Sequence, residues 1–134
     1  MSYKKQFHAE TQLKLSPFFD RTSLLNQSQE WRRWSGYLSA TNYELNHDNE
    51  YFAIRTKAAL LDITPLYKYL IEGPESQKFL HRLVTRNINI CKVGQVMYTP
   101  WCDESGKVID DGTVQRLSDH KFRITSAEPN LEWL

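Results

Sequence analysis

The sequence predicts an α+β fold, because segments with helical periodicity are separated by segments that carry the signals of β-hairpins. Apolar residues recur at helical spacing in the middle of the chain. Polar and apolar residues alternate towards its end, as they do in half-buried strands. A length of 134 residues allows one domain with a modest core. We expect this domain at residues 16–134, after a polar, flexible N-terminal arm at residues 1–15.

The first half of the chain contains one ambiguous segment and one predicted helix. Residues 31–37 carry aromatic side chains at helical spacing, but Gly36 interrupts them, so this segment is either a short helix or an irregular loop. Farther along, a stripe at positions i, i+3, i+7 and i+10 predicts a helix that Asp48 or Asn49 caps and that ends by Pro65. The stripe consists of Tyr51, Ile54, Ala58 and Leu61.

The second half alternates strand and helix signals. Residues 67–71 are rich in β-formers and predict a strand. A helix is expected next, with Pro74 at its first position and an apolar stripe of Phe79, Leu80, Leu83 and Val84. Residues 129–134 are expected to open another helix. Between these helices, three β segments joined by turns are predicted: residues 96–102, then residues 107–109 continuing past Gly112 into residues 113–117, and residues 121–125.

Composition and charge argue against several classes of function. The net charge of +1 gives no electrostatic reason to expect a nucleic acid or an anionic membrane as partner. No apolar run approaches the roughly 20 residues that span a bilayer, and the N-terminal lysines are not followed by the apolar segment of a secretory signal. We therefore expect a cytoplasmic protein in which Cys91 and Cys102 are reduced thiols; a disulfide between them is the alternative.

Paired acidic residues between predicted strands are the strongest candidate for chemistry. Asp110 and Asp111 can be solvated turn residues, or one of them can act as a base or fix the protonated nitrogen of a bound heterocycle. The four histidines are scattered without metal-ligand spacing, so no metal site is predicted. The four tryptophans and seven tyrosines either fill a core or line a pocket for a flat, ring-bearing ligand.

Four segments, in the same order and at compatible spacing, resemble the glycine cleavage T-protein family of folate-binding aminomethyltransferases. Residues 52–63 resemble the family's segment AVRTAAGLFDVSHMG, and residues 73–85 resemble its segment GPDA-FLQRLVTND. Residues 94–111 resemble GQALYTLMCNEDGGVIDD, and residues 130–134 resemble the start of the family's next helix. The resemblance covers residues 16–134 and matches roughly the first third of a complete member.

The resemblance implies that the chain supplies most of the first of two related α+β subdomains that enclose folate. The family's reaction moves a one-carbon unit from an amine-bearing donor to N5 of tetrahydrofolate. Asp111 matches the catalytic aspartate, whose implied role is to hold and polarise the reduced pterin. Tyr98 matches a tyrosine that lines the folate pocket. The further cofactor-binding positions that the resemblance implies are Leu66, Thr113, Gln115 and Ser126.

Several positions depart from the family pattern. Leu66 replaces a pocket methionine, Gln115 replaces a tyrosine, and Ser126 replaces an asparagine. A Leu-Met pair becomes Pro100–Trp101, and Trp101 is expected to add an aromatic wall that suits a methylated cation or an aryl ether. We therefore expect a small-molecule methylated donor in preference to the lipoyl carrier protein of glycine cleavage.

Two further expectations follow from the resemblance. The alternative function is a folate-binding module without transferase activity, of the type that assists iron–sulfur assembly. The chain by itself is expected to be inactive and to bind folate poorly, because the pocket also needs walls from the second subdomain.

Overall fold

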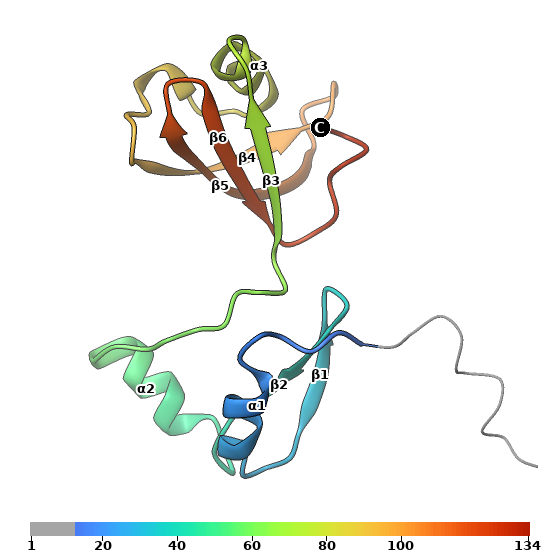
Figure 1. Ribbon diagram of the computed structural model, residues 1–134, viewed down its shortest axis with the longest axis vertical. Helices are drawn as coiled ribbons and strands as arrows, with labels where there is room; N and C mark the ends of the chain where they lie inside the picture. The colour runs from blue at the N-terminus through green and yellow to red at the C-terminus, as the bar shows by residue number, and fades with distance from the viewer. Residues whose placement is uncertain (1–12) are drawn as a thin grey trace, which may run out of the picture. The chain divides into compact units, whose positions relative to one another are not determined.

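The computed structural model describes residues 13–134, and the predicted arm at residues 1–15 lies almost wholly outside them. The chain divides into two compact units at Pro65, and we describe each by itself (Figure 1). Unit 1 ends at Pro65, and unit 2 comprises Leu66–Leu134. The extent of a single domain over residues 16–134 stays a prediction.

Unit 1 contains a β-hairpin where the sequence suggested a short helix or an irregular loop. Strand β1, Trp31–Trp34, pairs antiparallel with strand β2, Tyr37–Ala40. Between them, Ser35 and Gly36 have φ angles of 46° and 83°. Positive φ at both central residues is typical of a two-residue turn whose twist matches that of the paired strands. Both earlier interpretations are therefore wrong: the aromatic spacing arises from two strands and their turn.

Helix α2, Asp48–Thr56, confirms the predicted helix but ends earlier than expected. Lys57 follows with φ −135° and ψ −117°, which lies outside the helical region. His47 occupies the cap position and its side chain makes no capping hydrogen bond, so the predicted capping by Asp48 or Asn49 is wrong. The N–H of Asp48 donates instead to Oδ1 of Asn46 at 3.2 Å. The other helical elements of unit 1 are α1, Phe19–Thr22, and the 3₁₀ helix η1, Ser23–Leu25.

Unit 2 is built on a four-stranded antiparallel sheet with the strand order β3-β6-β5-β4. Helix α3 and this sheet confirm the predicted α+β class, and the predicted strands agree with the observed ones to within a residue or so at each end. The elements are β3, Tyr67–Glu72; α3, Ser76–Leu83; the 3₁₀ helix η2, Ile88–Ile90; β4, Val96–Cys102; β5, Val108–Ser118; and β6, Lys121–Ser126.

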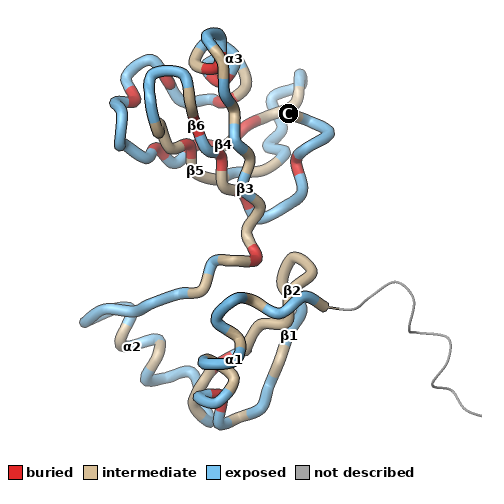
Figure 2. The backbone as a smooth tube through the Cα atoms, in the orientation of Figure 1, coloured by how far each residue is buried: buried red, intermediate tan, exposed pale blue. Residues whose placement is uncertain are grey.

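The core of unit 2 lies between α3 and one face of the sheet, where the buried positions of this unit concentrate (Figure 2). Leu80 and Val84 from the predicted helical stripe are buried there together with strand residues. Removal of these apolar side chains from water is the main force that holds the helix on the sheet. The core cluster consists of Leu80, Val84, Ile88, Cys91, Met97, Trp101, Val114, Phe122 and Ile124.

One local prediction in unit 2 is wrong. Helix α3 begins at Ser76, so Pro74 precedes the helix and does not occupy its first position. A turn in which the Gly73 carbonyl accepts from the Ser76 N–H at 3.1 Å leads into the helix instead. At the end of the chain, the Asn130 carbonyl accepts from the N–H groups of Trp133 and Leu134, both at 3.0 Å. This closes one turn, and the bond from Leu134 spans the four residues of an α-helical turn.

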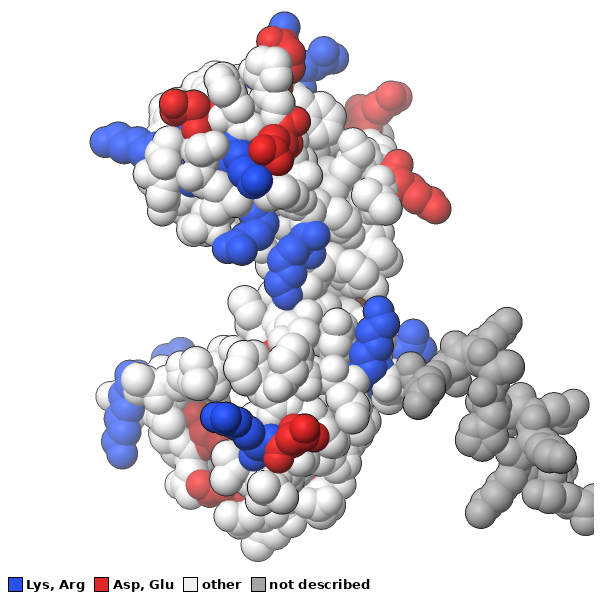
Figure 3. Space-filling view, in the orientation of Figure 1, with Lys and Arg blue, Asp and Glu red and all other residues white. Residues whose placement is uncertain are grey.

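Three features of the structure bear on the expectations drawn from composition: the surface charges, the two cysteines and the lengths of the helices. Basic and acidic side chains are interspersed on the face drawn in Figure 3. Cys91 and Cys102 are both free thiols, as predicted. Within residues 13–134, no helix combines the length and the apolar character that a membrane crossing requires.

Candidate functional site

The sheet of unit 2 has a core face and an outer face, because successive side chains of a strand point to opposite sides. On β5, Val114 is fully buried on the core face. Its neighbours Thr113 and Gln115 are half-buried, and Asp111 is exposed, on the outer face. On β4, Tyr98 is 60% exposed between two buried residues. The outer face therefore gathers several predicted site residues.

A hydrogen bond links the two strongest candidates on this outer face. The Tyr98 hydroxyl donates to Oδ2 of Asp111 at 2.6 Å. The strand register makes the contact possible, because Tyr98 lies opposite Thr113 and Pro100 lies opposite Asp111. The bond to the Asp111 carboxylate raises the pKa of Tyr98, and desolvation and the negative charge of Asp111 add to the effect. Within residues 13–134, no group donates a hydrogen bond to Oδ1 of Asp111.

Asp110 has a different environment from Asp111, although the two are adjacent. Its Oδ1 accepts from the N–H of Asp111 at 2.8 Å. Its Oδ2 accepts from the side-chain amide of Asn130 at 2.6 Å and from the N–H of Glu128 at 3.4 Å. Asp110 therefore braces the segment that follows β6. The interpretation of Asp110 as a solvated turn residue is wrong, because it lies within strand β5 and its carboxylate is bonded to the chain.

Asn130 is the centre of a buried polar cluster on this side of the sheet. It is 6% exposed, and its side-chain amide also donates to Ser126 Oγ at 3.2 Å and to the Glu128 carbonyl at 3.0 Å. Its backbone N–H donates to the Tyr69 hydroxyl at 2.7 Å. Ser126 is 2% exposed and belongs to this cluster. The structure thus separates Ser126 from Asp111, with which the sequence grouped it.

Gly112 allows β5 to approach β6 closely. It lies opposite Thr99 of β4 and Ser126 of β6. A Cβ atom at this position would lie 2.1 Å from the backbone oxygen of Thr125, far inside contact distance. A glycine after the two aspartates is therefore a packing requirement of the central strand.

The model of the family described as the GCVT N-terminal domain matches residues 21–134, which is most of the chain. The chain belongs to this family. The predicted resemblance to the N-terminal part of the T-protein is thereby confirmed.

Individual relatives agree with this assignment. The chain is 31% identical to an aminomethyltransferase of Halothermothrix orenii over 121 residues, which cover 90% of this chain and 33% of that protein. It is 42% identical to a trimethylamine-oxide aldolase of Ruegeria pomeroyi over 86 residues, or 63% of this chain and 11% of that protein. The crystal structure of the glycine cleavage system aminomethyltransferase T from Bartonella henselae superposes with a TM-score of 0.77 at 23% identity, over 91% of this chain and 33% of that one. The chain thus spans a third or less of the length of these relatives.

The remaining predicted site residues lie in different parts of this GCVT domain. Gln115 faces outward, and its side-chain oxygen accepts from the guanidinium of Arg123. Leu66 precedes β3, at the opposite edge of the sheet from Tyr98. Trp101 is 1% exposed and lies in the core. The expectation that Trp101 forms an aromatic wall near the pocket is therefore wrong, because strand alternation turns it to the core face.

Sequence reasoning missed two polar residues that the GCVT domain places beside the site. Arg123 was overlooked as part of a half-buried strand, yet its position in the alternation of β6 puts it on the outer face. Asn130 was interpreted as the beginning of a helix, and only the fold brings it to Asp110. The alternation could have revealed Arg123, whereas no local signal could have revealed the contact of Asn130.

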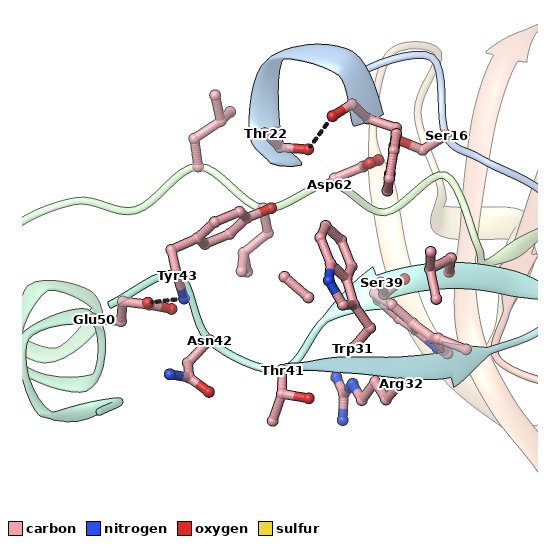
Figure 4. A pocket seen from close by; sticks show the side chains of 16 residues that line it. Ser16, Thr22, Trp31, Arg32, Ser39, Thr41, Asn42, Tyr43, Glu50 and Asp62 are labelled. Atoms are coloured by element: carbon pink, nitrogen blue, oxygen red, sulfur yellow. Dashed lines mark hydrogen bonds between the residues drawn. The ribbon is translucent and has the colours of Figure 1, made fainter. Parts of the chain in front are cut away.

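A cavity of about 170 Å³ in unit 1 is lined by aromatic and polar side chains (Figure 4). A polar side chain of its lining forms hydrogen bonds with the backbone of a neighbouring loop. Glu50 accepts from the N–H groups of Tyr43 at 2.6 Å and Glu44 at 3.2 Å. The ring of Trp31 packs on Phe19 with centroids 5.2 Å apart. Both rings are half-buried and line the cavity.

The acidic turn between β4 and β5 is structural. Oδ1 of Asp103 accepts from the hydroxyl and the N–H of Ser105, at 2.7 and 2.9 Å, and from the N–H of Lys107 at 2.9 Å. These hydrogen bonds, that of the Ser105 hydroxyl first, lower the pKa of Asp103. Among residues 13–134, no group of three or more histidine, cysteine or acidic side chains could hold a metal ion.

Proposed function

We propose that this GCVT domain binds tetrahydrofolate on the outer face of its sheet and takes part in one-carbon transfer, with Asp111 as the catalytic residue. The observation that carries the proposal is the Tyr98–Asp111 pair, which presents an aromatic ring and a carboxylate with one uncommitted oxygen on the same open face. The family membership and the aminomethyltransferase relatives support it.

The residues on this face fit a reduced pterin. Oδ1 of Asp111 is available to accept from ligand N–H groups, since its other oxygen is the one that Tyr98 contacts. The exposed ring of Tyr98 offers a surface on which a flat heterocycle can stack. The Thr113 hydroxyl lies on the same face and can donate or accept.

The chemistry requires a negative charge held in one place. Tetrahydrofolate supplies the nitrogen that receives the one-carbon unit. Positive charge develops on nitrogen during such a transfer, and the Asp111 carboxylate stabilises it. Tyr98 contributes by fixing the orientation of that carboxylate through its 2.6 Å hydrogen bond. A tyrosine with its ordinary pKa is already protonated at neutral pH, so Tyr98 remains a donor there, and the same bond raises its pKa further.

The donor that we propose is a small methylated molecule; a lipoyl carrier protein is the second candidate. Leu66 and Gln115 depart from the family pattern, and a relative of this chain is named as a trimethylamine-oxide aldolase. The relatives described above give no support to the alternative module of the iron–sulfur assembly type. We also propose that the protein acts in the cytoplasm.

Binding is tested on the chain itself. The ¹⁵N-labelled protein is titrated with 5-formyltetrahydrofolate, a reduced folate that resists oxidation, and amide shifts are recorded. We expect weak binding with shifts centred on Tyr98, Asp111 and Thr113, and their loss in Asp111→Asn. Shifts confined to unit 1, or none up to the solubility limit, would contradict the proposal.

Catalysis is tested in a chimera in which residues 1–134 replace the matching third of the Halothermothrix orenii aminomethyltransferase. Asp111→Asn should reduce turnover by about 100-fold or more, because it keeps the shape of the side chain and removes its charge. Asp110→Asn should reduce turnover less. A larger loss from Asp110→Asn would show that the wrong aspartate is assigned.

The same chimera separates the donors. Its turnover is measured with dimethylglycine, a sulfonium compound, an aryl methyl ether and an aminomethyl-loaded lipoyl carrier, beside the unmodified parent enzyme. We expect a shift in preference towards a methylated small molecule relative to the parent. Turnover of the lipoyl carrier alone would overturn the donor proposal and leave the folate proposal standing.

A further inference from the structure

Arg123 stands out on the outer face because it has a fixed position and no acidic partner. It is exposed, and its guanidinium donates to the side-chain oxygen of Gln115 on the neighbouring strand. Within residues 13–134, no carboxylate lies at ion-pair distance from it. A guanidinium has five N–H donors in a rigid fork, so the bond to Gln115 leaves others for a ligand.

The register places Arg123 at a defined distance from Asp111. Gln115 follows Asp111 by four positions on β5, which corresponds to about 13 Å along a strand, and Arg123 lies directly opposite Gln115. Thr113 lies between them on the same face, opposite Thr125. The outer face therefore carries a strip with an anionic end at Asp111 and a cationic end at Arg123.

Two charged residues of β3 flank the cationic end. Lys68 lies opposite Thr125 of β6, one outward position away from Arg123, and its ammonium donates to the Leu66 carbonyl at 2.7 Å. Such diagonal neighbours lie about 7–8 Å apart, within reach of long side chains. On the other side, Glu72 lies opposite Lys121 and pairs with it at 3.3 Å, so this pair adds no net charge. The charges along the strip favour one orientation of a bound molecule, with its N–H-bearing end at Asp111 and its anionic end at Arg123.

We propose that Arg123, oriented by Gln115, binds a carboxylate of the ligand whose reacting end lies at Asp111. The inference rests on the proposed function, because it needs a ligand on this face. Arginine pairs with carboxylates through two parallel hydrogen bonds, which supplies both affinity and orientation. In a reduced folate, the carboxylates lie on the glutamate tail, at the end of the molecule away from the pterin. A methylated amino acid instead carries its carboxylate close to the reacting nitrogen, so a separation of about 13 Å favours the tail.

The experiment divides the ligand into its parts. The ¹⁵N-labelled chain is titrated separately with p-aminobenzoylglutamate, which is the tail without the pterin, with tetrahydrobiopterin, which is the pterin without the tail, and with dimethylglycine. We expect p-aminobenzoylglutamate to shift the signals of Arg123 and Gln115, and tetrahydrobiopterin to shift those of Tyr98 and Asp111. Shifts at Arg123 caused by dimethylglycine and not by the tail would assign the carboxylate to the donor.

The variant Arg123→Gln should weaken the binding of p-aminobenzoylglutamate by about 10-fold or more, since a hydrogen bond to a charged group is lost. Arg123→Lys keeps the positive charge and loses the forked guanidinium. Its affinity for p-aminobenzoylglutamate should therefore lie between that of the unaltered chain and that of Arg123→Gln. The control is Arg82→Gln, which removes an exposed arginine from α3 on the other side of the sheet. The amide spectrum of each variant verifies that the sheet is intact.

The outcomes distinguish this inference from the proposed function. Equal losses in Arg123→Gln and Arg82→Gln, or no binding of p-aminobenzoylglutamate up to its solubility limit, would overturn the carboxylate site. If tetrahydrobiopterin still shifts Asp111 in that case, the proposed function stands without it. If tetrahydrobiopterin leaves Asp111 unchanged while the tail binds at Arg123, the carboxylate site stands and the proposed pterin site fails.

Discussion

The two faces of the sheet in unit 2 use the same strands for different purposes. On the core face, Val114, Phe122 and Ile124 are fully buried against α3 and its neighbours. On the outer face, Tyr98 and Asp111 are exposed and joined by a hydrogen bond. Because side chains alternate along a strand, stability and binding can be assigned to adjacent residues without conflict. Each face can therefore be altered with little effect on the other.

Asp110 and Asp111 show the difference at the scale of one residue. The carboxylate of Asp110 accepts three hydrogen bonds from the chain, including one from the buried Asn130. The carboxylate of Asp111 accepts one, from Tyr98. Two residues of the same type therefore differ in their capacity to accept hydrogen bonds from a ligand. Their positions in the pleat of the strand decide which carboxylate is available.

The largest expected effect comes from the core face. Phe122→Ala should lower the free energy of unfolding of unit 2 by about 3–5 kcal/mol, because it removes a fully buried ring and leaves a cavity. Tyr98→Ala on the outer face should change it by less than about 1 kcal/mol. Urea unfolding followed through the amide signals of β5 and β6 measures both. Similar losses would show that the outer face is also part of the stabilising core.

Gly112→Ala should cost about 1–3 kcal/mol or more, because the added methyl group meets the backbone oxygen of Thr125 and the two strands must separate. The substitution lies between the two faces and should perturb both. The amide signals of Thr113 and Thr125 should move most. A stability equal to that of the unaltered chain would mean that the β5–β6 contact is looser than described. Thr113→Ala, one residue along, is the control.

Asn130→Ala should lower the stability by about 1–3 kcal/mol, because it removes donors from the Asp110 carboxylate and from Ser126 in a buried setting. Asp111→Asn should leave the stability nearly unchanged, since Asp111 is exposed. Thermal unfolding of the two variants gives their stabilities, and these compare a residue of the core face with a residue of the outer face directly. The reverse order would contradict the assignment of the two aspartates.

The smallest effect concerns the titration of Tyr98. Its pKa is raised by the bond to Asp111, so the bond is complete below the ordinary tyrosine range and is lost as the pH rises through the raised value. Asp111→Asn should move the pKa of Tyr98 back towards its ordinary value. The Cζ signals of ¹³C-labelled tyrosines report this, with Tyr98→Phe to assign the resonance. An unchanged titration in Asp111→Asn would show that the bond is absent in solution.

Local patterns predicted the regular elements of unit 2 well. Alternation and turn residues located β4 and β6, and the apolar stripe located α3. The predictions failed where a long-range contact decides the conformation. Residues 31–37 form two paired strands, which their spacing alone could not show. The contacts of Asn130 with Tyr69 and Asp110 likewise join segments far apart in the sequence, and no local pattern could show them.

The sequence by itself determined the α+β class, the family, and Asp111 and Tyr98 as the candidate pair, because these depend on patterns carried by short segments. Only the tertiary structure decided which side chains share a face. It placed Ser126 and Trp101 on the core face, brought Tyr98 to Asp111, and set Arg123 beside Gln115. These outcomes depend on the register between strands, and a shift of one residue would turn every side chain of a strand to the other face.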